Sequence, residues 1–220
     1  MLKPVAMNRL TAKIPESVSS NCVEALLKNS QIIKHKAKAT IIAAGDEGDS
    51  VYLLLDGTAS VSIIDEDGKE MIVSSVNAGE FVGELGIFDT SDRKRTAWVK
   101  AKSECTVARV AYKKFEELAF EEPGVLFLVG SQLVHRLKAT TKKLGDLAFM
   151  EVAGRISRCL MDLCEEDDAM THPDGKQIKI SRQEIGLRVG CTREMAGKVL
   201  KNLEEQGLVE VSGKTIVVFN

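Results

Sequence analysis

Apolar residues along this chain are spaced in one way up to about residue 111 and in another way beyond residue 123. From Ala39 to Ala111 they form short runs, such as Val51-Tyr-Leu-Leu-Leu, which glycine and acidic residues interrupt. Such runs, with turn dipeptides like Asp56-Gly57 and Asp67-Gly68 between them, are typical of antiparallel strands joined by hairpins. This part of the chain is therefore predicted to be a compact β-roll or barrel.

A long helix is predicted after Pro123, because apolar or small residues recur there at alternating steps of four and three. They are Leu126, Gly130, Leu133, Leu137, Thr140, Leu144 and Leu147. A stripe this narrow, opposite a polar face, indicates a helix that packs along another helix. We expect a parallel homodimer; the alternative is a helix lying on its own β-roll. Thr140 would need a hydrogen-bond partner inside such a stripe, and a bound ligand could supply it.

The segment that begins at Ser181 has the cap residues of two short helices joined by a tight turn. Ser181 and Glu184 have the capping-box spacing, in which the two side chains satisfy free N–H groups where a helix begins. Gly190 permits the turn, and Thr192 is expected to cap the second helix. A hairpin with Lys214 at its tip follows. This order of elements predicts a winged helix-turn-helix.

The second of these helices divides into two arcs at 100° per residue. Its apolar arc holds Met195, Ala196, Val199, Leu200 and Leu203, and its other arc holds Arg193, Glu194, Gly197, Lys198 and Lys201. Such a helix can pack on its own domain with one face and read base edges in the DNA major groove with the other. Arg182 and Thr192, near helix N-termini, are expected to contact phosphates, and Gln183 and Lys214 complete the predicted DNA-binding set. The alternative is a helical hairpin with a solvated charged face.

The net charge of −2 argues against a protein that coats nucleic acid or an acidic membrane indiscriminately. DNA binding would therefore require a local patch. Between Ser181 and Lys201 five basic residues face two acidic ones, so positive charge is concentrated in this segment.

Two domains and an α+β fold are predicted from this order. Gly145 and the residues after it break the apolar period, and a new amphipathic helix begins at about Val152. The first domain is placed at residues 1–149, including a dimerisation helix at about 124–148. The second, at residues 150–220, is the winged helix-turn-helix.

The glycine-rich turn at Gly83-Glu-Leu-Gly86 and the later Arg95-Thr96 pair have the chemistry of a phosphate and ribose site. Glycines let a backbone approach a ligand, Glu84 can accept ribose hydroxyl hydrogens, and Arg95 can bond phosphate oxygens. The alternative is a turn closed by a surface ion pair between Glu84 and Arg95. Spacing alone favours that alternative.

Several classes of protein are disfavoured by composition. The chain has 220 residues, and it lacks an apolar run of membrane-spanning length or a signal-peptide core, so we expect a cytoplasmic protein without membrane contact. Its five cysteines lack metal-ligand spacing and are expected to be structural thiols, with no metal bound. No Ser/His/Asp or Cys/His set emerges, so an enzyme is not predicted.

Four motifs resemble the bacterial cyclic AMP receptor protein family of transcription factors. They are Phe81-Val-Gly-Glu-Leu-Gly-Ile-Phe, Arg95-Thr-Ala-Trp-Val, Asp168-Ala-Met-Thr-His-Pro-Asp-Gly, and Arg182-Gln-Glu-Ile-Gly with Gly190-Cys-Thr-Arg-Glu. The likeness extends from about Ile32 to Phe219. It implies that the jelly-roll-like first domain binds cyclic AMP as an allosteric ligand and that the protein is a DNA-binding regulator, mainly an activator.

The resemblance also implies a set of ligand contacts. The cyclic ribose-phosphate would be held by Gly83, Glu84, Arg95 and Thr96, in a pocket lined by Val61, Ser74 and Leu85. Arg136 and Thr140 would come from the long helix of the same subunit, and Thr141 from the other subunit, to meet the adenine. Thr96 and Thr141 stand where the family has serines, and Lys198 stands where it has an arginine.

The implied partners are a palindromic promoter site on double-stranded DNA, a second copy of the chain, and RNA polymerase. Thr171, His172, Pro173 and Gly175 resemble the region that touches the C-terminal domain of the polymerase α-subunit; otherwise they form only a tight turn. Glu151 replaces an aspartate as the expected cap of the hinge helix. The alternative function is a family member gated by a different small ligand, such as haem, or one that is constitutively active.

Overall fold

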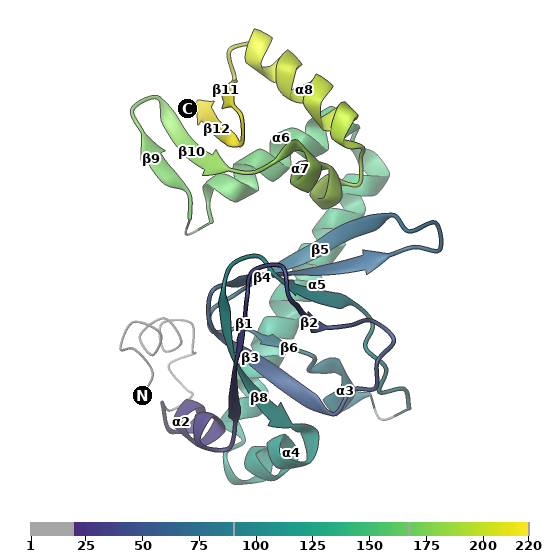
Figure 1. Cartoon of the computed structure of the whole chain (residues 1–220), viewed down its shortest axis with the longest axis vertical. Helices are drawn as coiled ribbons and strands as arrows, with labels where there is room; N and C mark the ends of the chain where they lie inside the picture. The colour runs from purple at the N-terminus through teal and green to yellow at the C-terminus, as the bar shows by residue number, and fades with distance from the viewer. Residues whose placement is uncertain (1–19, 90, 167, 220) are drawn as a thin grey trace. The chain divides into compact units, whose positions relative to one another are not determined.

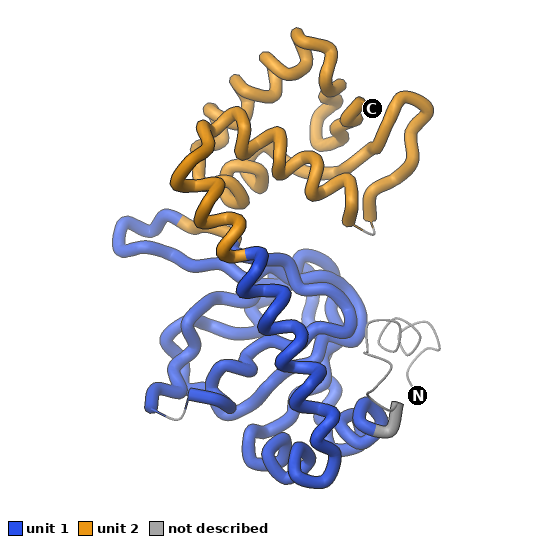
Figure 2. The backbone as a smooth tube through the Cα atoms, turned by 180° about the vertical axis from the view of Figure 1, so that it is seen from behind, with its two compact units in different colours: residues 1–69, 73–139 blue, residues 70–72, 140–220 orange. Residues whose placement is uncertain are grey.

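The computed structural model describes residues 20–89, 91–166 and 168–219 (Figure 1). It divides into two compact units (Figure 2). Unit 1 contains the described residues up to Lys69 and residues 73–139, and unit 2 contains residues 70–72 and the chain from Thr140 onward. The long helix α5 (Gly124–Phe149) contributes to both units. Among the described residues, no helix has the length and apolar character needed to cross a membrane.

Unit 1 is built on two four-stranded sheets, with strand orders β1-β8-β3-β6 and β2-β7-β4-β5. The registered pairs are antiparallel; Val51 of β3, for example, lies opposite Val110 of β8. The strands are β1 (Gln31–His35), β2 (Thr40–Ile42), β3 (Ser50–Asp56), β4 (Thr58–Ile64), β5 (Glu70–Asn77), β6 (Phe81–Val82), β7 (Trp98–Ala101) and β8 (Cys105–Ala111). The predicted β-roll is confirmed.

Strand β3 explains the uninterrupted apolar run in the sequence, because both of its faces are buried. Val51, Leu53 and Leu55 belong to a cluster with residues of α2 (Ser20–Lys28), α4 (Tyr112–Glu121) and α5. Leu54 belongs to a second cluster, which joins residues of both sheets. Successive side chains of a strand point to opposite faces, so only a strand covered on both sides carries apolar residues without alternation.

The turn at Asp56-Gly57 differs from the sequence prediction. It does not close a hairpin, because β3 and β4 belong to different sheets and the turn carries the chain from one sheet to the other. Gly57 has a φ of +87°, and a Cβ atom there would lie 2.2 Å from the Glu104 carbonyl oxygen. Asp67-Gly68, in contrast, joins the sheet neighbours β4 and β5, as predicted.

Unit 2 packs three helices against a four-stranded sheet of order β11-β12-β10-β9. The elements are α6 (Val152–Cys164), β9 (Met170–His172), β10 (Gly175–Lys179), α7 (Arg182–Val189), α8 (Arg193–Glu205), β11 (Val209–Ser212) and β12 (Thr215–Phe219). Its core includes Ile156, Leu160, Ile185, Leu200 and Ile216, all at most 1% exposed. The β11–β12 hairpin is the predicted wing, so the α+β fold class with a winged helix-turn-helix is confirmed.

Helix α5 continues through Gly145, where the apolar period breaks, and ends at Phe149. Helix α6 begins at Val152, after the two residues Met150 and Glu151. Glu151 occupies the N-cap position of α6 in an extended conformation, but its side chain makes no capping hydrogen bond. Glu151 therefore stands at the expected cap position, but its side chain does not cap the helix.

The close approach at Gly57 predicts that Gly57→Ala is far more destabilising than Gly68→Ala. Both glycines have positive φ, but no atom lies within 4 Å of a Cβ at Gly68. Gly68→Ala should cost about 1 kcal/mol from backbone strain alone, and Gly57→Ala at least about 3 kcal/mol because the backbone must shift as well. Denaturant unfolding followed by fluorescence of Trp98, the only tryptophan and a residue of unit 1, measures both. Equal losses of unfolding free energy in the two variants would contradict the steric explanation.

Candidate functional site

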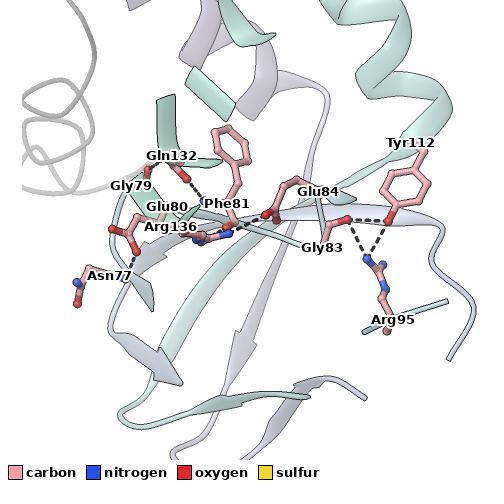
Figure 3. Close-up of polar contacts among 10 residues, drawn as sticks. All are labelled: Asn77, Gly79, Glu80, Phe81, Gly83, Glu84, Arg95, Tyr112, Gln132 and Arg136. Carbon is pink, nitrogen blue, oxygen red and sulfur yellow. Dashed lines mark hydrogen bonds and ion pairs between the residues drawn. The ribbon is translucent and has the colours of Figure 1, made fainter. Parts of the chain in front are cut away.

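Arg95 and Glu84 are buried charged side chains of unit 1, with exposures of 9% and 5%. Arg95 donates from Nη1 to the carbonyl oxygen of Gly83 (3.0 Å) and to the hydroxyl of Tyr112 (2.8 Å) (Figure 3). Its Nη2 donates to the carbonyl oxygen of Ser50 (2.7 Å). These bonds use three of the five guanidinium N–H groups. Among the described residues, the Nε hydrogen and one Nη2 hydrogen are left for another acceptor.

The hydrogen-bond partners of Arg95 are all neutral. Two carbonyl oxygens and a phenol hydroxyl satisfy its hydrogens but do not offset its charge. A buried charge without a bonded counter-ion favours the binding of an anion, and a guanidinium can bond two oxygens of one phosphate. Arg95 therefore has the charge and the free donors that an anion site requires.

Glu84 pairs with Arg136 of α5 and not with Arg95, so the surface ion pair considered from the sequence is wrong. The distance between Arg136 Nη1 and Glu84 Oε1 is 2.7 Å, and Arg136 Nη2 donates to the carbonyl oxygen of Phe81 (Figure 3). Spacing along the chain did not reveal this partner, because it lies 52 residues away. The second carboxylate oxygen of Glu84 has no hydrogen-bond partner among the described residues.

Gln132 also joins α5 to this turn. Its side-chain oxygen accepts from the backbone N–H of Phe81 and its amide nitrogen donates to the carbonyl oxygen of Gly79, both at 2.8 Å. Gln132 and Arg136 are four residues apart and therefore lie on one face of α5. Gln132 was not among the predicted site residues, and its four-residue spacing from Arg136 was the available signal for a shared role.

Gly83 is required where it stands. Its φ is +78°, and a Cβ atom there would lie 2.4 Å from Arg95 Nη1. The backbone can therefore approach the guanidinium only because this residue has no side chain.

Burial raises the pKa of the Tyr112 phenol above its usual value, although the adjacent Arg95 acts in the opposite direction. The phenol therefore remains protonated around neutral pH. In that form it can donate to Gly83 while accepting from Arg95.

The structure brings four of the predicted pocket residues together: Gly83, Glu84, Arg95 and Arg136. Two other predicted pocket residues of unit 1, Val61 and Ser74, are half-buried on the neighbouring strands β4 and β5. The last two, Leu85 and Thr96, are exposed. Thr140 and Thr141 are exposed on α5 and belong to unit 2, so the contacts of unit 1 do not involve them.

Helix α5 has two apolar faces. One fits the interpretation of a helix lying on its own β-roll, and the other fits that of a helix in a homodimer. Val125, Leu128 and Val129 are buried against the sheet of the roll. Leu137 and Leu144 are 68% and 67% exposed, and Leu126 and Leu147 of the same stripe are both 39% exposed. A row of exposed leucines on a helix indicates a protein-binding surface.

Ser181 and Thr192 cap the two helices of the helix-turn-helix as predicted. Ser181 Oγ accepts from the N–H of Glu184 and Thr192 Oγ1 from the N–H of Met195, both at 3.1 Å. Gly190 ends α7 in the left-handed conformation, with φ +71°. One backbone N–H in the first turn of each helix is thus satisfied by a local side chain, which stabilises the point where each helix begins.

Burial along α8 follows the predicted arcs with one correction. Ala196 and Leu200 are buried, Val199 and Leu203 are half-buried, but Met195 is 43% exposed because it lies in the first turn, at the edge of the apolar arc. Arg193, Glu194, Lys198 and Lys201 are exposed, as are Arg182, Gln183, Thr192 and Lys214. Gly197 is half-buried beside Arg182, and a Cβ atom there would lie at an ordinary contact distance of 3.5 Å from Arg182 Cδ.

Arg188 is not part of the exposed basic surface. It lies 3.4 Å from Glu166 and 3.6 Å from Glu184, and its side chain is 13% exposed. The five basic residues counted in this segment therefore supply four exposed charges. Hydrogen bonds from the backbone and the Thr192 hydroxyl lower the pKa of Glu194, so Glu194 is an anion on this surface at neutral pH.

The segment from Thr171 to Gly175 contains the end of β9, the turn at Pro173-Asp174 and the first residue of β10. Thr171 and Pro173 are exposed and His172 is half-buried, whereas Gly175 is buried. A Cβ atom at Gly175 would lie 2.0 Å from the carbonyl oxygen of Val218. Gly175 therefore allows β12 to lie close to the start of β10, and it offers no side chain to a partner.

Two family models match the chain: Cyclic nucleotide-binding domain over residues 32–122 and Crp-like helix-turn-helix domain over residues 154–220. The chain is 53% identical over 199 residues to the cAMP-activated global transcriptional regulator Vfr of Pseudomonas aeruginosa, covering 90% of this chain and 93% of Vfr. It is 48% identical over 197 residues to the cAMP-activated global transcriptional regulator CRP of Salmonella typhimurium, again covering 90% of this chain and 93% of the relative. The chain belongs to the CRP family.

A solved structure of the CRP family agrees with this assignment. The global regulator CLP of Xanthomonas campestris, described as c-di-GMP-responsive, has a TM-score of 0.87 and 36% sequence identity, covering 92% of this chain and 100% of CLP. As a CRP-family member with a Crp-like DNA-binding domain, the protein is a transcription regulator and not an enzyme.

Proposed function

We propose that the protein is a cAMP-gated regulator that binds palindromic promoter DNA as a homodimer. The observation that carries the proposal is Arg95, a buried cation with neutral partners and two N–H groups left for an anion, held against the turn at Gly83. A cyclic phosphate has the charge and the paired oxygens that this guanidinium can bond.

In the proposed complex, Arg95 and Thr96 bind the phosphate and Glu84 binds the ribose. Glu84 Oε1 is engaged by Arg136, which leaves Oε2 to accept a ribose hydroxyl hydrogen. Val61, Ser74, Gly83 and Leu85 line the pocket. Thr140 of the same protomer and Thr141 of its partner meet the adenine, as the family resemblance implies.

The exposed leucines of α5 form the proposed dimer contact. Leu137 and Leu144 are the most exposed of the stripe, and burying them against a second copy would remove apolar surface from water. Two copies related by twofold symmetry present two α8 helices, which suits successive major grooves of a palindromic site.

The proposed gate lies between domains 1–149 and 150–220. Ligand at the turn around Glu84 contacts Arg136, and α5 continues from Arg136 to the short Met150-Glu151 connection before α6. A ligand that favours one pairing of the long helices would shift the population in which both DNA-binding domains fit their half-sites.

We also propose that Thr171, His172, Pro173 and Gly175 form the contact with the C-terminal domain of the RNA polymerase α-subunit, Gly175 through its backbone only. Thr171 and Pro173 are exposed at the end of the β9–β10 hairpin, which suits a docking surface. Because its targets are promoters, the proposed site of action is the cytoplasm.

A cyclic dinucleotide is the second candidate ligand, since CLP, which is described as c-di-GMP-responsive, is similar over 92% of this chain. Its phosphates could also reach Arg95. Calorimetric titrations with cAMP and c-di-GMP separate the two proposals.

Arg95→Leu should weaken cAMP binding at least about 100-fold, or about 2.7 kcal/mol, because it removes the only bidentate donor proposed for the phosphate. Isothermal titration calorimetry measures the change. Lys94→Leu is the matched control, since it removes the same charge from an exposed neighbour. Tight cAMP binding by Arg95→Leu would refute the pocket, and binding of c-di-GMP without cAMP would favour the second ligand.

Glu194→Ala should relax discrimination at one base pair by about 1 to 3 kcal/mol, because an exposed carboxylate on α8 can accept from cytosine N4. Competition binding across operator variants, at one salt concentration, gives the preference at each position. Glu210→Ala, an exposed carboxylate on β11, is the control and should leave the preferences unchanged. Unaltered preferences in Glu194→Ala would remove this residue from the DNA-reading set.

A further inference from the structure

Both tyrosines of the chain lie against Arg95, but their hydroxyls have different roles. The Arg95 Cζ atom is 5.8 Å from the ring centroid of Tyr52 and 5.6 Å from that of Tyr112. The Tyr112 hydroxyl accepts from Arg95 Nη1 at 2.8 Å and donates to the Gly83 carbonyl oxygen at 2.6 Å. The Tyr52 hydroxyl interacts with Arg109 instead. Tyr112 therefore ties the guanidinium to the glycine turn.

The surrounding backbone leaves space for this hydroxyl. A Cβ atom at Gly86, in the short helix α3 (Leu85–Phe88), would lie 2.6 Å from the Tyr112 hydroxyl oxygen, and a Cβ at Gly48 would lie 3.0 Å from it. Tyr112 itself is 2% exposed. Two glycines from separate segments thus accommodate one phenol, whose position is set by packing as well as by hydrogen bonds.

The bonds made by Nη1 determine how Arg95 can meet a ligand. Both Nη1 hydrogens are occupied, by Gly83 and by Tyr112, and one Nη2 hydrogen is occupied by Ser50. A planar guanidinium held at three points can offer only its Nε hydrogen and its other Nη2 hydrogen to an incoming anion. Removing the Tyr112 hydroxyl would free one Nη1 hydrogen and allow other orientations.

We propose that Tyr112 is a positioning residue, whose hydroxyl orients Arg95 so that it meets one particular exocyclic oxygen of the cyclic phosphate. This inference rests on the proposed function. Tyr112 does not touch the ligand. It fixes the guanidinium of Arg95 before the ligand binds, so binding does not carry the entropy cost of ordering that side chain.

The two diastereomeric phosphorothioates of cAMP test this orientation. They have the same charge and nearly the same size, but sulfur replaces a different exocyclic oxygen in each. The wild-type protein should prefer one of them at least about tenfold in Kd by calorimetry, because sulfur is the weaker acceptor where Arg95 donates. In Tyr112→Phe the Kd for cAMP should rise about tenfold, and the preference should fall to about threefold or less.

Tyr52→Phe is the matched control: it removes the same atom and keeps a ring over Arg95, so the wild-type preference should persist. If Tyr112→Phe weakened both phosphorothioates equally and kept the preference, its role would be structural only and the inference would be overturned. A wild-type protein with no preference would overturn it too.

Gly86→Ala provides a second route if Tyr112→Phe melts at a lower temperature. The added methyl must displace the phenol, so Gly86→Ala should lose the preference, and retention of it would again contradict the inference. Failure of the wild-type protein to bind cAMP or either phosphorothioate would refute the proposed function, whereas binding with a preference unaffected by the variants would refute only the role of Tyr112.

Discussion

A buried guanidinium with neutral partners is the interaction on which the rest of unit 1 depends. Arg95 is held by carbonyl oxygens from two separate segments and by a phenol at the start of α4. Bringing these groups together requires the left-handed turn at Gly83 and the end of β8 beside it. The buried cation that results has neutral hydrogen-bond partners and two N–H donors left among the described residues, which suits an anionic ligand.

Helix α5 is the element that connects this site with the rest of the chain. One of its faces closes the core of the roll, Gln132 and Arg136 bond the turn beside Arg95, and a third surface exposes leucines. The same helix extends into unit 2 without interruption. The turn beside Arg95 is therefore bonded to the same continuous helix that offers the proposed dimer contact.

Local features were predictable from the sequence where local physics determines them. The caps at Ser181 and Thr192, the left-handed Gly190 and the buried face of α8 follow from hydrogen bonding and periodicity within a few residues. Asp56-Gly57 was misread because a turn dipeptide specifies its own geometry, and not the sheet that the next strand joins. The partner of Glu84 and the role of Tyr112 depend on contacts between distant segments, which spacing along the chain does not encode.

The central claim is that a cyclic nucleotide at Arg95 controls DNA binding by the exposed face of α8. A titration of a labelled palindromic duplex with the full-length protein, with and without saturating cAMP at one salt concentration, tests it most directly. The account predicts that cAMP tightens DNA binding at least about tenfold, a coupling of about 1.4 kcal/mol. Equal affinity for the duplex in the presence and absence of cAMP would contradict it.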